Sequence, residues 1–267
     1  MTHNPDIANY SSRNIELRDG HIISDEYNPH ILSAVEVCML FSKSAADDTQ
    51  RVRVKICGIT REDDVVAAVD AGADAVGFIC YAGSPRFVSP SRLMSLASLV
   101  PPSVTKVLLF VNPKAEEVRE YLSFVPDATL QFHGNESRAF CDQFHVRYIK
   151  AVSIDKPERL TEAQNDYPMA AALLADAAGV TRGGTGMSFD WQAVASVRSR
   201  ITKPLIVAGG LTAENVCEAI RTLSPWAVDV ASGVESAVGV KDPAKITAFM
   251  EAVNNAGDVA ACEEARD

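Results

Sequence analysis

The sequence predicts a single α/β domain, a closed (β/α)8 TIM barrel preceded by an N-terminal extension. From residue 51 onward, eight short runs typical of β-strands alternate with stretches typical of helices. Strands that are joined by helices must run parallel, and eight such units in roughly 200 residues match the size of a closed barrel. The alternative is an open doubly wound sheet, but the G-x-G-x-x-G motif usual after its first strand is missing here.

The strand candidates are short runs rich in β-branched and other apolar residues, bounded by turn-forming sequence. They span residues 51–57, 74–80, 105–111, 128–133, 147–153, 171–176, 203–209 and 227–231.

Helical stretches follow several of these runs, and residues suited to begin a helix precede them. Thr60 precedes 61–72, where Gly72 can end the helix, and Asn112-Pro113 precedes 114–124. Thr212 precedes 213–223, and Asp242-Pro243 precedes 244–253.

Alternation along the strands predicts which side chains face the barrel interior. In the first strand Val52, Val54 and Ile56 should lie under the helices, leaving Arg53, Lys55 and Cys57 inside. In the fourth strand Leu130 and Phe132 take the outer face, and Gln131 and His133 the inner one. The first and last strands of a closed barrel are neighbours, so we expect Lys55 to contact Asp229.

Composition excludes several classes of function. The chain has 267 residues, 47% of them apolar, and its net charge of -10 disfavours a nucleic-acid binder. No apolar run approaches the ~18 residues that a membrane-spanning helix needs, and the polar N-terminus does not resemble a signal peptide. A cytoplasmic protein that does not enter the membrane is expected. Oligomeric state is left open between monomer and homodimer.

The two ends do not fit the strand and helix alternation. Residues 1–50 form the extension, whose one amphipathic patch, 31–41, could dock as a helix on the barrel; otherwise the extension is poorly ordered or a gene-start artefact. The barrel should span 51–255, and 256–267 reads as a frayed tail. The six cysteines are scattered, without C-x-x-C pairs or clustering with histidine, so no metal site or disulfide framework is expected and the thiols should be reduced.

A barrel of this type places its site at the carboxyl ends of the strands. The loops after the last three strands are the phosphate-binding candidates: the glycine-rich 179–186, the pair Gly209-Gly210, and Ser232-Gly233. Glycines let backbone N–H groups approach an anion closely, and Thr212 and Ser232 can each begin a short helix whose positive end faces the anion.

Cys57 and Asp176 are the acid–base candidates, each at the carboxyl end of a strand. A thiol with a pKa near 8.5 can take a proton from carbon with little tuning. Position alone leaves other roles open, because Cys57 could be a small buried hydrophobe and Asp176 a loop cap. Arg86 follows Ser84-Pro85 in a turn, where its fork of donors could hold a substrate carboxylate or lie in solvent.

An ordered set of motifs resembles the phosphoribosylanthranilate isomerase family of tryptophan biosynthesis. The set is KICGIT (55–60), GFICYAGSPRFV (77–88), LFVN (109–112), LQFHG (130–134), LLADAAGVTRGGTGMSFDW (173–191), PLIVAGGLTAENV (204–216) and VDVASGVES (228–236). The resemblance covers about residues 54 to 249. Each motif is weak by itself, but their order is specific.

The resemblance implies an enzyme that catalyses an Amadori rearrangement of N-(5-phosphoribosyl)anthranilate, with no metal or organic cofactor. Carried over by motif, Cys57 is the general base, Asp176 the general acid and Arg86 the clamp for the substrate carboxylate. Gly209, Gly210, Ser232 and Gly233 become the phosphate cradle. Gln131, His133 and Asp229 are assigned to substrate binding, with His133 in an orienting role.

Two other functions remain open at this point. A histidine-pathway phosphosugar isomerase also performs an Amadori step, but it typically uses two catalytic aspartates and a doubled phosphate site. A non-catalytic phosphometabolite-binding barrel is the second alternative.

Overall fold

The computed structural model describes residues 13–18, 21–27, 51–177 and 190–257 of the chain. The chain divides into two compact units, residues 1–50 and 51–267. In the first unit, β1 (Arg13–Arg18) pairs antiparallel with β2 (His21–Tyr27). This hairpin is not among the elements predicted from the sequence. The 31–41 patch lies outside the described residues, so its docking stays a prediction.

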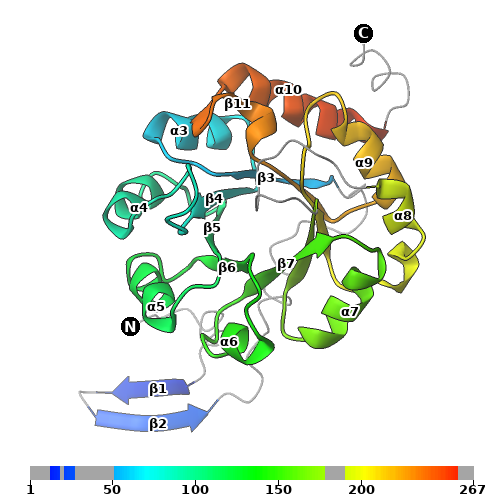
Figure 1. Cartoon of the computed structure of the whole chain (residues 1–267). Helices are drawn as coiled ribbons and strands as arrows, with labels where there is room; N and C mark the ends of the chain where they lie inside the picture. The colour runs from blue at the N-terminus through cyan, green and yellow to red at the C-terminus, as the bar shows by residue number, and fades with distance from the viewer. Residues whose placement is uncertain (1–12, 19–20, 28–50, 178–189, 258–267) are drawn as a thin grey trace. The chain divides into compact units, whose positions relative to one another are not determined.

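The second unit is the predicted closed barrel of eight parallel strands, seen along its axis in Figure 1. Each predicted run corresponds to one strand, and β7 and β8 each extend one residue beyond the predicted end. The strands are β3 (Arg53–Cys57), β4 (Ala75–Ile79), β5 (Thr105–Phe110), β6 (Thr129–Phe132), β7 (Tyr148–Ile154), β8 (Ala172–Ala177), β9 (Leu205–Val207) and β10 (Ala227–Val230). The barrel closes where β10 pairs with β3.

Helices surround the strands as a ring (Figure 1). They are α3 (Glu62–Asp70), α4 (Pro90–Ala97), α5 (Ala115–Phe124), α6 (Arg138–Asp142), α7 (Glu158–Asp166), α8 (Trp191–Ala195), α9 (Val216–Leu223) and α10 (Pro243–Asn254). After β10 come a short 3-10 turn, Ser232–Val234, and a two-stranded hairpin of β11 (Glu235–Ala237) and β12 (Val240–Lys241).

The predicted capping residue is right at α10 but not at α3, α5 or α9, although α3 and α5 begin within one residue of the predicted helices. Asp242 caps α10 by accepting from the N–H groups of Ala244 and Lys245. Thr60 does not cap α3, because its hydroxyl instead donates to the carbonyl of Gly239, at 2.6 Å. The helix expected after Thr212 begins four residues later, at Val216, because the N–H of Thr212 donates to Oδ1 of Asn215 in a preceding turn.

Two apolar layers confirm the predicted alternation. An inner layer fills the barrel, with Val107, Ile149, Ala151, Ala172, Leu174, Ile206, Ala208 and Ala227 buried together. An outer layer between strands and helices includes Val54, Ile56, Leu130 and Phe132. Arg53 departs from the expectation, because it is exposed at the amino end of β3, where its guanidinium lies over the Trp226 ring.

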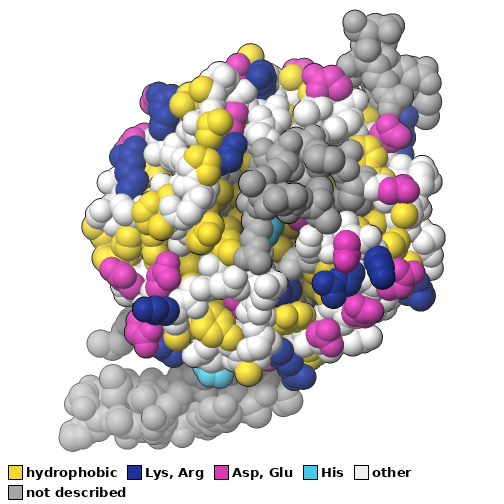
Figure 2. Space-filling model, in the orientation of Figure 1, with side chains coloured by type: hydrophobic (Ala, Val, Ile, Leu, Met, Phe, Trp, Pro, Cys, Tyr) yellow, Lys and Arg dark blue, Asp and Glu magenta, His cyan; other side chains and the backbone are white. Residues whose placement is uncertain are grey.

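The surface carries apolar side chains over α4 and the connection that precedes it, as Figure 2 shows. Tyr81, Phe87, Met94 and Leu99 are large hydrophobic residues exposed in this part of the chain. Within the described residues, no helix is long and apolar enough to span a bilayer.

Candidate active site

A pocket at the carboxyl ends of the strands collects most of the predicted site residues. Its cavity of about 90 Å³ is bordered by residues of β3, β4, β5, β8 and β10 and by residues of the loops after β4, β5, β6, β9 and β10. The lining includes eight predicted residues: Cys57, Arg86, His133, Asp176, Gly209, Gly210, Asp229 and Ser232. Ile79, Tyr81, Leu109 and Val111 give it an apolar wall. The thiol of the first barrel unit and the carboxyl of the sixth therefore border the same space.

Cys57 lies beside a buried ion pair. Nζ of Lys55 donates to Oδ2 of Asp229 at 2.8 Å, which confirms the contact predicted across the β3–β10 seam. Gly77 on the neighbouring strand makes room for both β3 side chains, because a Cβ there would lie 2.9 Å from Sγ of Cys57 and 3.0 Å from Cε of Lys55. The side chains of Lys55 and Cys57 therefore both pack against Gly77.

This environment sets the proton affinity of the thiol. Burial raises the pKa of Cys57 above its ordinary value, and the positive charge of Lys55 partly offsets that rise. Burial alone would lower the pKa of Lys55, but Asp229 and Cys57 outweigh it and hold the pKa above its ordinary value. The expectation that the thiol needs little tuning is therefore wrong, because its thiolate depends on a neighbouring cation.

His133 connects the candidate acid to the barrel interior. Its Nε2 lies 2.9 Å from Oδ2 of Asp176, and its Nδ1 lies 3.0 Å from Nε2 of Gln131. Gln131 is fully buried behind His133 and does not line the pocket. Its Oε1 has no partner among the described residues, and exchanging the amide O and N would give His133 Nδ1 an acceptor. The Gln131 amide can therefore accept from or donate to Nδ1 of His133, whichever ring nitrogen of His133 carries the proton.

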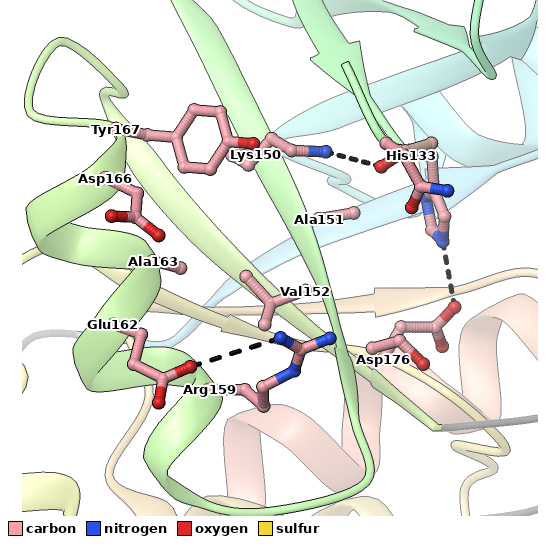
Figure 3. Close-up of a pocket in the computed structure, with 13 residues that line it drawn as sticks. His133, Lys150, Ala151, Val152, Arg159, Glu162, Ala163, Asp166, Tyr167 and Asp176 are labelled. Atoms are coloured by element: carbon pink, nitrogen blue, oxygen red, sulfur yellow. Dashed lines mark hydrogen bonds and ion pairs between the residues drawn. The ribbon is translucent and has the colours of Figure 1, made fainter. Parts of the chain in front are cut away.

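A second cavity, of about 470 Å³, is also lined by His133 and Asp176. His133 and Asp176 border it from one side, α7 contributes Arg159 and Glu162, and Tyr167 follows directly after that helix (Figure 3). Lys150 holds its floor by donating to the carbonyl of Gly134 at 2.8 Å and to Glu136 at 3.0 Å. His133 and Asp176 therefore border both cavities.

Arg86 is fixed by a partner that sequence analysis did not identify. Its Nε and Nη2 donate to the two carboxylate oxygens of Glu235, at 2.7 and 2.6 Å. Lys241 donates to the same carboxylate at 2.9 Å, and all three side chains are buried. Arg86 nevertheless lines the pocket. Gly58 permits this placement, since a Cβ there would lie 2.6 Å from Cδ of Arg86.

The predicted phosphate loops have the required backbone. Gly209 and Gly210 both have positive φ angles, 84° and 65°, which glycine adopts without strain. Gly233 packs so tightly on the neighbouring loop that a Cβ would lie 2.0 Å from the Leu211 carbonyl oxygen. Gly233 itself does not line the pocket. The 179–186 loop lies outside the described residues.

Across the described ranges, no three His, Cys, Asp or Glu side chains gather as a metal site would require. Cys57, Cys80 and Cys141 are free thiols. Cys217 is disulfide-bonded, contrary to the expectation of reduced thiols throughout.

Comparison with known proteins decides the family. The family described as N-(5'-phosphoribosyl)anthranilate (PRA) isomerase matches residues 54–252. The chain belongs to the PRA isomerase family. This match extends over the whole barrel from β3 to α10 and confirms the resemblance seen in the motifs.

Individual PRA isomerases agree with the assignment. The chain is 50% identical over 204 residues to N-(5'-phosphoribosyl)anthranilate isomerase of Pseudomonas fluorescens strain Pf0-1, covering 76% of this chain and 98% of the relative. The isomerase of Dechloromonas aromatica is 46% identical over 208 residues, covering 78% and 99%. A crystal structure of phosphoribosyl anthranilate isomerase from Thermotoga maritima aligns with a TM-score of 0.70 and 38% identity, covering 76% and 98%.

The site contains residues beyond those the PRA isomerase motifs had marked for a role. Glu235 lies inside the quoted motif VDVASGVES, but sequence analysis gave it no function. Lys241 stands outside every quoted motif, immediately before the cap of α10. A buried pairing between residues 149 positions apart has no local signal in the sequence.

Proposed function

We propose that the pocket at the barrel mouth carries out the family's isomerisation with Cys57 as general base and Asp176 as general acid. The chain is an isomerase of tryptophan biosynthesis that converts N-(5'-phosphoribosyl)anthranilate to 1-(2-carboxyphenylamino)-1-deoxyribulose 5-phosphate. The observation that carries the residue roles is that Cys57 and Asp176, from opposite parts of the barrel sequence, line one cavity.

Ring opening is assigned to Asp176. Its carboxylic acid gives a proton to the ribose ring oxygen while the anthranilate nitrogen pushes electrons toward C1, so that the C1–O bond breaks and a protonated Schiff base forms. His133, 2.9 Å from Oδ2, holds the carboxyl toward the cavity. Asp176 is left as a carboxylate after this step.

Proton removal at sugar C2 is assigned to Cys57. Its thiolate takes the C2 proton, and the electrons of that C–H bond form the C1–C2 double bond of an enolamine, which tautomerises to the ketone. The Lys55 ammonium supports the thiolate inside a site where burial opposes it. A single general base of this kind typically contributes 10²-fold to 10⁴-fold in rate.

The two ends of the substrate carry negative charge and require separate binding groups. The phosphate is assigned to the backbone of the Gly209-Gly210 turn and the Ser232-Gly233 turn. The carboxylate is assigned to Arg86, and the aromatic ring to the apolar wall that includes Tyr81. Asp229, which also lines the pocket, is assigned to the sugar.

The proposal extends to the ligand, the oligomeric state and the location of the protein. The ligand is a small phosphosugar, and a neighbouring solved structure is an isomerase in complex with reduced 1-(o-carboxyphenylamino)-1-deoxyribulose 5-phosphate, at 36% identity and a TM-score of 0.67. Another solved structure is of monomers generated from the dimeric isomerase of Thermotoga maritima. We propose a cytoplasmic monomer or homodimer that uses no cofactor and binds neither nucleic acid nor membrane.

A turnover assay on the full chain tests the proposal against its rivals. Loss of anthranilate-type fluorescence from N-(5'-phosphoribosyl)anthranilate should occur without added metal, and the histidine-pathway ribonucleotide should be a much poorer substrate. Preference for the histidine-pathway substrate would favour that isomerase. Tight phosphate binding without any rearrangement would favour a non-catalytic barrel.

A further inference from the structure

The guanidinium of Arg86 has two usable edges, and one is occupied. Nε and Nη2 form the side-on fork that holds Glu235 with two hydrogen bonds. The planar group has five donors, so the end-on fork made by Nη1 and the second N–H of Nη2 is left for another acceptor. Because Arg86 lines the pocket, a ligand carboxylate can use that second edge.

Lys241 connects this arginine to the opposite end of the site. Its Nζ donates to Oε1 of Glu235 and, also at 2.9 Å, to the carbonyl of Ala231. Ala231 follows β10 and immediately precedes the Ser232-Gly233 turn. One buried ammonium therefore bonds both to the carboxylate that holds Arg86 and to the backbone next to the candidate phosphate cradle.

We propose that Glu235 and Lys241 are positioning residues that fix the separation between the carboxylate-binding and phosphate-binding ends of the site. Glu235 holds Arg86 directly and reaches the phosphate end only through Lys241, so it serves mainly the carboxylate end. Lys241 bonds to both ends and serves both. The inference rests on the proposed function, in which Arg86 binds the carboxylate of the substrate.

Two probes that differ by one group separate this role from a general structural one. The first is reduced 1-(o-carboxyphenylamino)-1-deoxyribulose 5-phosphate, and the second is its phenylamino counterpart without the carboxylate. Dissociation constants of both are measured by titration calorimetry for the wild-type chain and for Glu235→Gln, Lys241→Met and the control Glu62→Gln. Glu62 is held by Arg92 on α4 and does not line the pocket.

Glu235→Gln should weaken binding of the carboxylate probe by about tenfold or more, the change expected for a disturbed charge-assisted contact, and alter binding of the other probe less than about threefold. Lys241→Met should weaken both, and Glu62→Gln neither. Glu235→Asp, which keeps the charge with a shorter reach, should recover part of the loss and serves if the Gln variant does not fold.

Two results would overturn the inference in different ways. Equal weakening of both probes by Glu235→Gln, or no change in either, would reduce Glu235 to a structural role. If the wild-type chain itself bound both probes equally, the assignment of Arg86 to the carboxylate would fail, and the positioning role would fail with it.

Discussion

Lys55 and Asp229 pair across the seam where the barrel closes, with Nζ and Oδ2 2.8 Å apart. The two residues are direct neighbours in the parallel register of β3 and β10. Oδ1 of the same carboxylate is buried with no hydrogen-bond partner in the described part of the chain. The pair therefore brings a cation to Cys57 and keeps one acceptor for a ligand that enters the pocket.

Removing that cation should change how the rate depends on pH. In Lys55→Met the pKa of Cys57 rises further, because Lys241 alone then offsets burial, so less thiolate is present at a given pH. The alkaline rise of kcat/KM should move up by about one pH unit or more. Steady-state rates measured across the pH range check this expectation.

The control for this variant addresses the carboxylate left behind. An unpaired buried Asp229 destabilises the fold by about 3–5 kcal/mol, so Lys55→Met combined with Asp229→Asn should recover stability. The displaced pH profile should persist in the double variant, since the cation is still missing. A profile identical to wild type in Lys55→Met would show that Lys55 does not act on the base.

His133 should matter for turnover more than for binding. His133→Leu removes a hydrogen-bond partner of Asp176 Oδ2, and a misplaced acid can cost about 10²-fold in kcat. Gln131→Leu, which leaves His133 in place but removes its second partner, should cost less. Parallel measurement of kcat and KM for both variants tests the order, and full activity in His133→Leu would reject the orienting role.

The phosphate cradle should depend on backbone rather than on the Ser232 hydroxyl. Gly233→Ala places a Cβ 2.0 Å from the Leu211 carbonyl, so the turn must shift, and KM should rise about tenfold. Ser232→Ala keeps the N–H groups and should leave KM nearly unchanged. The comparison of the two KM values decides the matter, and a larger effect from Ser232→Ala would assign the phosphate to the hydroxyl.

Glu235 should make stability sensitive to acid. Although burial alone would raise the pKa of Glu235, Arg86 and Lys241 outweigh it and lower the pKa below the ordinary value near 4.3. A lowered folded-state pKa gives stability that is complete above the unfolded-state pKa and is lost as pH falls through the folded-state pKa. Wild type should therefore exceed Glu235→Gln in free energy of unfolding at pH 6, by about 3 kcal/mol, and the gap should shrink below pH 4. Urea titrations at several pH values provide the test, which a constant gap would contradict.

Much of the architecture could be predicted because it is encoded locally. Each barrel strand is a short apolar run whose alternate residues pack inside the barrel or under the helices, and this pattern is visible without knowledge of the fold. The Lys55–Asp229 contact was predictable too, because barrel closure makes the first and last strands neighbours. The location of Cys57 and Asp176 in the pocket was predictable because each lies at the carboxyl end of its strand.

The rest depends on partners that are distant in sequence. Thr60 has the side chain of a helix cap, but its hydroxyl bonds to a carbonyl 179 residues away, and this tertiary contact replaces the local one. Glu235 is an ordinary surface-type residue until Arg86, 149 positions earlier, is placed against it. Cys57 is likewise buried only once the barrel has folded, and this burial is what raises its pKa.

Paired variants of the base and the acid test the central claim most directly. Cys57→Ser, Asp176→Asn and the control Cys80→Ala, which alters a buried thiol outside the pocket, are compared for turnover of N-(5'-phosphoribosyl)anthranilate and for affinity toward the reduced product analogue. Both site variants should lose at least about 10²-fold in kcat while binding the analogue within a few-fold of wild type, and Cys80→Ala should keep its activity. Near-wild-type turnover in either site variant would contradict the account.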